Sequence, residues 1–239
     1  MTQISIIIPC YHDHEALLDC LASLQLTDQD EIIVVDASPL PAPQSQFAAF
    51  PQVQWQQCAP NRSAQLNQGA KAATGDFLLF LHADSVLPPL WRESILAPLS
   101  DPDVRLTAFR FTTDSSALAF RLLDRFVWLR CALFQRPYGD QGFCLSTSSF
   151  ESIGGFPEQE LMEDYEFITQ IKKIGKITTV EEALITSARR WSKFGIIRTT
   201  FLNQWVTLLY RLHVSPVKLG QLYRQGKFIL PVDNTARKK

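Results

Sequence analysis

Residues 4–36, ISIIIPCYHDHEALLDCLASLQLTDQDEIIVVD, decide the fold. Residues 4–9 form a short apolar run that ends at a proline, which is typical of a buried strand. Residues 15–26 place their leucines at helical spacing, and residues 31–36 are rich in β-branched side chains, as buried parallel strands are. The stretch therefore predicts a strand, a helix and a second strand.

The alternation continues along the next fifty residues. Residues 53–58 and 77–81 read as strands, and the Ala-rich segment 63–73 between them reads as a helix that Gly75 ends. Alternating strands and helices predict an α/β fold with a parallel sheet covered by helices. Ligands bind such sheets outside the carboxyl ends of the strands. Because Asp36 and Asp84 follow strand ends, we expect both to face one crevice.

The second half of the chain is less regular. Segments 104–112, 138–146 and 176–185 contain expected strands, and helices are expected over 117–134, 162–174, 194–212 and 216–224. No linker-like segment separates these elements. We therefore expect one domain over residues 1–239.

Composition indicates an ordinary globular protein, and the uneven distribution of charge along the chain bears on its partner. The chain has 239 residues, with 46% hydrophobic and 20% charged, which excludes disorder, collagen and coiled coil. The net charge is -1, but residues 1–61 hold seven acids and no Lys or Arg, whereas residues 184–239 hold eleven bases and one acid. The basic end predicts an anionic partner (phosphate, nucleic acid or lipid) or a solvated face, two readings that charge alone does not separate.

The cysteines and the start of the chain indicate the compartment. Five cysteines without a C-x-x-C pair fit reduced thiols in a cytosolic protein. The first residues lack the basic flank of a signal peptide, and polar residues interrupt the apolar stretch 194–214. A cytoplasmic chain without a transmembrane helix is expected.

Two carboxylates at strand ends carry the expected chemistry. Asp36 can accept hydrogen bonds from a nucleotide, and Asp84 offers the oxygen ligand that Mg²⁺ or Mn²⁺ prefers. Capping of the following loop is the alternative for each. Because the chain has neither a Gly-x-Gly-x-x-Gly nor a Walker lysine motif, phosphate binding is expected to use a metal and arginines, Arg62 among them.

Two further clusters lie in the second half. Glu163-Asp164 opens a helix, where acids are either electrostatic caps or a general base. Arg189-Arg190-Trp191 lies in the basic third and could clamp a diphosphate and stack on a sugar, or form a surface pair. His82 is expected to be a packed residue, because no His or Cys stands at ligand spacing from it.

Together these residues resemble the inverting family 2 glycosyltransferases of the GT-A fold. The resemblance rests on the first strand, Val34-Val35-Asp36, and the segment from Ala64 to Asp84. Four motifs in the second half sharpen it towards the small soluble bacterial subgroup labelled radical-SAM/selenodomain-associated: Tyr138-Gly139-Asp140-Gln141-Gly142, Gly154-Gly155-Phe156-Pro157, Leu161-Met162-Glu163-Asp164 and Ser187-Ala188-Arg189-Arg190-Trp191.

The resemblance implies a fold and an activity. It implies a Rossmann-like GT-A fold with a mixed central sheet, divided into a nucleotide-binding half (1–100), an acceptor half (101–190) and C-terminal helices (191–239). It implies transfer of a sugar from a nucleoside-diphosphate sugar, a UDP-sugar being favoured, to an acceptor hydroxyl. The implied cofactor is a divalent cation, Mn²⁺ or Mg²⁺.

The resemblance also assigns roles to single residues. Asp164 would be the catalytic base and Asp84 the metal ligand. The donor would be bound by Pro9, Tyr11, Asp36, Arg62, Ala83, Asp84 and Arg190. The acceptor would be bound by Asp140, Gln141, Glu163 and Trp191.

Three departures from the family pattern limit the resemblance. His82 replaces the first acid of the Asp-x-Asp element, so metal binding rests on Asp84 alone. Tyr11-His12-Asp13 replaces the usual Asn-Glu, which affects the base pocket. Ser187 stands where processive members have Gln, which speaks against a polymer synthase.

Two rival functions stay open at this point. A sugar nucleotidyltransferase would usually carry a Gly-rich basic loop after the first strand, where this chain reads Cys10-Tyr11-His12-Asp13. A non-catalytic nucleotide-sugar binder or membrane-surface adaptor would keep the donor pocket and lose the base. Nucleic acid is not expected as a partner.

The apolar stripe of the helix expected at 194–212 has two interpretations. Packing in the core is favoured. The alternative is an interfacial helix that brings the chain to a lipid-linked acceptor at the inner membrane face. The stripe consists of Phe194, Ile197, Phe201, Trp205, Leu208 and Leu212.

Overall fold

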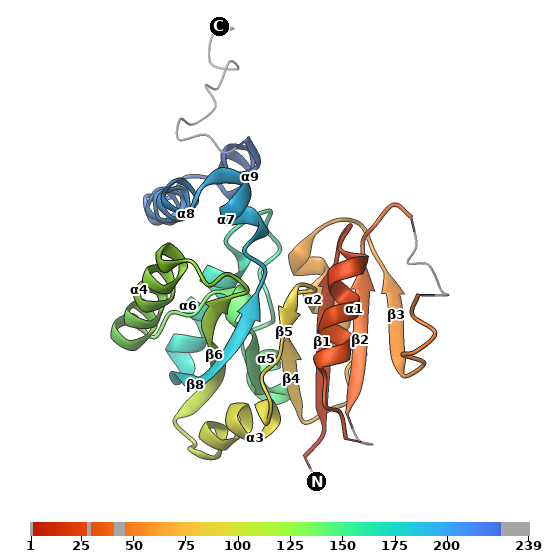
Figure 1. Ribbon diagram of the computed structural model, residues 1–239. Helices are drawn as coiled ribbons and strands as arrows, with labels where there is room; N and C mark the ends of the chain where they lie inside the picture. Colours follow the sequence, from red (N-terminus) through yellow and green to blue (C-terminus); the bar gives the residue numbers. More distant parts are fainter. Residues whose placement is uncertain (1, 28–29, 41–45, 226–239) are drawn as a thin grey trace, which may run out of the picture. The chain divides into compact units, whose positions relative to one another are not determined.

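The computed structural model describes residues 2–27, 30–40 and 46–225 (Figure 1). The chain divides into two compact units. The first unit comprises Met1–Glu158 and Glu163–Ser187, and the second comprises Gln159–Met162 and Ala188–Lys239. One domain over the whole chain stays a prediction.

The first unit is built on a sheet in the order β3-β2-β1-β4-β7-β6-β8-β5. Its first four strands run parallel, which confirms the prediction from the alternating pattern. In the second half β7 runs antiparallel to both β4 and β6, so the sheet is mixed. The strands are β1 (Ile4–Cys10), β2 (Glu31–Asp36), β3 (Val53–Gln57), β4 (Phe77–Phe80), β5 (Ser85–Val86), β6 (Val104–Thr113), β7 (Phe143–Ser146) and β8 (Lys176–Thr186).

Helices cover both faces of this sheet because successive side chains of a strand point to opposite sides. Ile6 and Ile8 of β1 join the core with α1 (His14–Ser23) and α3 (Trp91–Leu96). Ile7 joins the opposite core, which also contains residues of the other covering helices. These are α2 (Arg62–Ala72), α5 (Thr147–Ser152) and α6 (Glu163–Ile174), and α4 (Leu118–Phe134) packs against β6.

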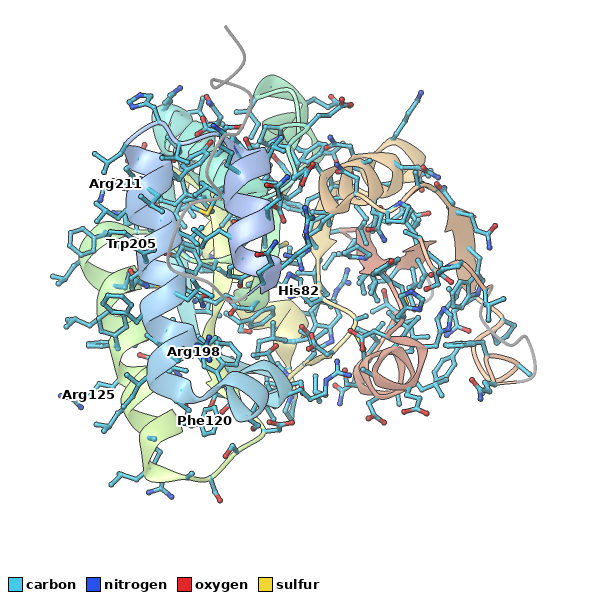
Figure 2. All side chains as sticks on the ribbon, turned by 90° about the horizontal axis from the view of Figure 1, so that it is seen from above. His82, Phe120, Arg125, Arg198, Trp205 and Arg211 are labelled. Carbon is cyan, nitrogen blue, oxygen red and sulfur yellow. The ribbon has the colours of Figure 1, made fainter. Side chains whose placement is uncertain are left out.

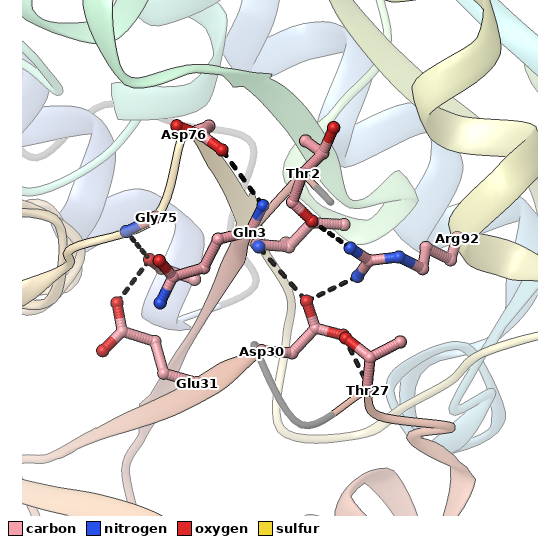
Figure 3. A network of polar contacts seen from close by, with 10 residues as sticks. Thr2, Gln3, Thr27, Asp30, Glu31, Gly75, Asp76 and Arg92 are labelled. Atoms are coloured by element: carbon pink, nitrogen blue, oxygen red, sulfur yellow. Dashed lines mark hydrogen bonds and ion pairs between the residues drawn. The ribbon is translucent and has the colours of Figure 1, made fainter.

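A polar network ties the amino ends of the first two strands together (Figure 3). Asp30, just before β2, accepts from Arg92 Nη1 at 2.5 Å and from the Ile4 backbone N–H at 3.2 Å. Arg92 also donates to the Thr2 carbonyl. Because the Asp30 side chain has no exposed surface, its ion pair with Arg92 ties α3 to the amino ends of β1 and β2.

Up to residue 225, where the described part of the chain ends, the second unit contains the helices α7 (Arg189–Phe194), α8 (Ile196–Arg211) and α9 (Pro216–Gln225). The sequence predicted one helix over 194–212. The structure corrects this, because Gly195 has φ 84 and separates Phe194, the last residue of α7, from α8. Arg224 of α9 pairs with Glu160 at 2.8 Å within the same unit.

Most of the apolar stripe of α8 is exposed and only Trp205 is half-buried among its described members, so the favoured interpretation of packing in the core was wrong. Leu202, Val206 and Leu209 form the buried face. The exposed members of the stripe are Ile197, Phe201, Leu208 and Leu212, and the side chain of Phe194 lies outside what the structure describes. Along the described part of the chain, no helix combines the length and apolarity that crossing a bilayer requires.

Candidate functional site

The candidate site lies where the strand order of the sheet reverses. β4 continues the sheet on one side of β1 and β2 on the other, and ligands of open α/β sheets bind at the carboxyl ends of such strands. His82, Ala83 and Asp84 follow the end of β4. This placement is the one that the alternating sequence pattern predicts for Asp84.

Two helix starts add charged groups to the same unit. Asn61 caps α2 by accepting the Ala64 N–H at 3.0 Å, which fixes Arg62 in the first turn. Arg62 Nη1 reaches Glu163 Oε1, at the start of α6, over 3.3 Å. Burial raises the pKa of Glu163, with Arg62 opposing the shift and Asp164 adding to it.

Asp164 is held by two backbone donors. The Gly139 N–H donates to Oδ2 at 3.1 Å, and the Tyr165 N–H donates to Oδ1 at 2.7 Å. The carboxylate borders a cavity whose polar lining also includes Arg62, His82 and Glu163. A carboxylate with a fixed orientation beside a cavity can accept a proton from a bound hydroxyl.

His82 faces the same cavity as a neutral ring. Burial and, to a smaller extent, the positive charge of Arg62 lower its pKa to about 3. A Cβ placed on Gly139 would lie 3.1 Å from His82 Nε2 and 3.7 Å from Asp164 Oδ2. Only glycine therefore leaves the space between these two side chains open.

Asp140 lies in the short 3₁₀ turn η2 (Gly139–Gln141). Its pKa is raised to about 6, mainly by burial and in part by the charges of Asp164 and Asp84, while Arg130 opposes the shift. Within the described residues its buried Oδ1 accepts no hydrogen bond. A buried carboxylate oxygen near a second acid fits a divalent cation, because both acids supply the hard oxygen ligands that Mg²⁺ and Mn²⁺ take.

Asp36 ends β2 and is held by partners that the sequence did not indicate. His14 Nε2 lies 2.8 Å from Asp36 Oδ2, and the Ser38 N–H donates to Oδ1 at 2.9 Å. Cys10, His14 and Asp36 offer ligand atoms within 4.8 Å of one another, the one such cluster in the described part of the chain. Burial raises the pKa of the Cys10 thiol to about 12, so the thiol is protonated and a poor metal ligand.

The other expected donor residues differ in exposure. Pro9 is half-buried in β1, Ala83 is buried, and Tyr11 is 51% exposed with its ring 4.4 Å from that of His12. The side chain of Arg190 lies outside what the structure describes, although its backbone belongs to α7.

The residues expected to bind the acceptor differ in burial and in the unit to which they belong. Gln141 has no exposed surface, and its amide accepts from Arg130 at 3.0 Å and donates to the Phe109 carbonyl at 2.9 Å. Its side chain therefore anchors the η2 turn. Trp191 belongs to the second unit, in α7. Arg130, which also stacks 3.6 Å above the Tyr138 ring, was missed because a helical arginine carries no motif.

Comparisons with known proteins identify relatives of both sequence and fold. Residues 5–150 match the family model described as glycosyl transferase family 2. A TPR repeat-containing protein of Synechococcus elongatus is 34% identical over 146 residues, which are 58% of this chain and 35% of that relative's length. The mannosyltransferase PcManGT of Pyrobaculum calidifontis, solved in complex with GDP-Man and Mn2+, matches with a TM-score of 0.65 at 18% identity, over 93% of this chain and 68% of its own.

Proposed function

The chain belongs to glycosyl transferase family 2, and from this premise we propose that it transfers a sugar, with inversion, from a nucleoside-diphosphate sugar to an acceptor hydroxyl. Its mixed sheet with covering helices is the GT-A fold. Family and fold were predicted from the sequence and are confirmed, whereas the small bacterial subgroup stays a prediction. The observation that carries the proposal is Asp164, oriented by two N–H donors beside a cavity.

Asp164 is the general base of the proposed reaction. Its carboxylate takes the proton of the acceptor hydroxyl while the acceptor oxygen forms a bond to the anomeric carbon. The bond between that carbon and the diphosphate oxygen breaks in the same step, and the nucleoside diphosphate leaves with the electron pair. A single displacement of this kind inverts the anomeric centre.

Positive charge must neutralise the departing diphosphate. Arg62 suits this role because its side chain is 54% exposed while it pairs with Glu163. Arg190 is the second candidate from the sequence. A divalent cation, which Asp84 would hold with Asp140 nearby, would supply Lewis-acid charge on the diphosphate.

A nucleoside-diphosphate donor is supported by the solved relative, whose complex contains GDP-Man and Mn2+. For this chain we propose a UDP-sugar, with the Asp36 carboxylate accepting a hydrogen bond from the nucleoside. Pro9, Tyr11 and Ala83 are proposed to line the same pocket. The His14 and Ser38 contacts give the Asp36 carboxylate one fixed orientation. This suits a carboxylate that must accept a hydrogen bond from one defined position on the nucleoside.

The acceptor is proposed to approach from the side of Asp164. Glu163, Asp140 and Trp191 are the candidate contacts, and Gln141 contributes by anchoring η2. A lipid-linked acceptor reached by peripheral membrane contact, on the cytoplasmic face of the inner membrane, completes the proposal.

Replacing Asp164 by Asn tests the base. We expect turnover to fall by about 10²–10⁴-fold, because proton removal is lost, with the donor dissociation constant changed less than about twofold. The rate of transfer is measured from the nucleoside diphosphate that is released, and donor binding is measured by calorimetry. Glu166→Gln is the matched control, since it removes an acid from the same turn of α6.

Near-normal turnover in Asp164→Asn would contradict the base assignment. Absence of both transfer and donor hydrolysis in the wild type, with intact nucleotide binding, would favour the non-catalytic binder. Pyrophosphate release from a nucleoside triphosphate and a sugar phosphate would indicate a nucleotidyltransferase instead.

A further inference from the structure

Helix α4 exposes an apolar face that the proposed reaction does not use. Most of its exposed large apolar residues recur every three or four positions and so share one side of the helix, whereas Trp128 and Phe134 fall outside that stripe. Each residue of the exposed set is at least 47% exposed, and the set consists of Leu118, Leu122, Phe126, Trp128, Leu129, Leu133 and Phe134. A continuous apolar face of this kind marks an interaction site rather than ordinary surface.

The opposite face of α4 fixes the helix in the first unit. Phe120, Leu123, Val127 and Cys131 are buried. Asp124 accepts from Thr112 Oγ1 of β6 at 2.8 Å. Because these contacts set the rotation of α4 about its axis, the apolar face stays outward.

The charge on the exposed face has one sign. Arg121 and Arg125 are exposed next to the apolar residues, and Arg125 lies on the outer side of α4 in Figure 2. Asp124, the sole acid in the sequence of α4, is engaged with β6. The face therefore offers apolar and aromatic side chains bordered by arginines, the composition of helices that lie in the interface of an anionic bilayer.

We propose that the outer face of α4 docks peripherally on an anionic lipid surface. The headgroups pair with Arg121 and Arg125, while Leu122, Phe126 and Leu129 enter the headgroup–acyl boundary. A second copy of this chain is a poorer occupant. A two-fold contact through α4 would bring the same two arginines of each copy together, and the described part of α4 has no exposed acid to compensate them.

The helix is also connected to the candidate site. Arg130 of α4 donates to Gln141 of η2 and stacks on Tyr138, and the Gly139 N–H of η2 donates to Asp164. Docking of α4 would therefore hold the cavity close to the lipid surface, where an acceptor with a lipid anchor would be presented. This last step rests on the proposed function, whereas docking itself does not.

Co-sedimentation with vesicles tests the proposal. The full chain is mixed with phosphatidylcholine vesicles and with vesicles containing about a third phosphatidylglycerol. We expect binding to the anionic vesicles and its loss at high salt, since salt screens the arginines. Leu122→Glu with Phe126→Glu should weaken binding at least tenfold, and Arg121→Gln with Arg125→Gln should weaken it mainly at low salt.

Matched variants separate α4 from the rest of the chain. Leu40→Glu changes an exposed leucine of the first unit outside α4. It should bind vesicles within about twofold of the wild type. Leu122→Ser with Phe126→Ser repeats the α4 test without new charge, and thermal unfolding checks that each variant is folded.

Three results would overturn the proposal: a wild type that ignores anionic vesicles at low salt, binding that survives both α4 pairs, or a stable dimer in sedimentation velocity that the α4 pairs dissociate. Nucleotide binding is measured on the same samples. Loss of vesicle binding with intact nucleotide binding supports docking, and it leaves the reaction to be judged on Asp164→Asn alone.

Discussion

At the residue scale, the buried acid Asp140 makes a prediction about pH. Its pKa is raised from an ordinary value of 3.8 to about 6, so the folded state binds its proton more tightly than the unfolded state. The stability that this proton contributes is complete below about pH 4 and is lost as the pH rises through about 6. Asp140→Asn should therefore match the wild type near pH 4 and exceed it near pH 7.5, by up to about 3 kcal/mol for a shift of about two units.

Urea unfolding across this pH range, with chelator present, measures the difference between the two proteins. Glu166→Gln serves as the control, because it removes an acid from α6 of the same unit. Parallel profiles for Asp140→Asn would show that the carboxyl is solvated rather than buried.

Single residues differ in how far the sequence could predict them. Asp36, Asp84 and Asp164 could be placed because strand ends and helix starts are recognisable from apolar periodicity. His14 and Gly139 could not, because their contacts with Asp36 and Asp164 join segments far apart in the chain. The exposure of Tyr11 and the complete burial of Gln141 likewise depend on packing that no local pattern records.

At the element scale, α2 packs closely on the sheet at Gly69. A Cβ on this glycine would overlap Cγ2 of Ile7 in β1 and lie 3.3 Å from Cγ2 of Val35 in β2. Gly69→Ala should therefore destabilise the protein by about 1–3 kcal/mol through overpacking, although alanine is the better helix former by about 1 kcal/mol. Urea unfolding measures the change.

A double-mutant cycle identifies the cause. Ile7→Ala removes the methyl group that the new Cβ would meet, so Gly69→Ala should cost clearly less in that background. An equal cost in both backgrounds would place the strain elsewhere in α2.

Elements could be predicted where they are long and periodic. The four parallel strands and helices α1, α2, α4 and α6 were expected within a few residues of their bounds. The two-residue strand β5 and the six-residue helices α3, α5 and α7 were missed, because so few residues show no period. The α8 stripe was misassigned because periodicity reveals an apolar face and does not say what covers it.

At the scale of the whole molecule, ligand binding should increase the stability of the folded chain. A ligand that binds only the folded chain raises the free energy of unfolding by about 2.7 kcal/mol at one hundred times its dissociation constant. We expect UDP with Mn²⁺ to raise the melting temperature by several degrees, more than GDP with Mn²⁺, and more than UDP without Mn²⁺. Thermal unfolding with each ligand measures these shifts.

Three variants assign the shift to its residues. Asp36→Ala should abolish most of the UDP shift, because the nucleoside loses its acceptor, and Asp84→Ala should abolish only the gain from Mn²⁺. Asp19→Ala, at an exposed acid of α1, should behave as the wild type.

A larger shift with GDP would overturn the preference for UDP, and equal Mn²⁺ gains in Asp84→Ala and the wild type would exclude Asp84 as the metal ligand. The absence of any shift with nucleoside diphosphates would contradict the proposed donor itself, because a donor site must bind the diphosphate that the reaction releases.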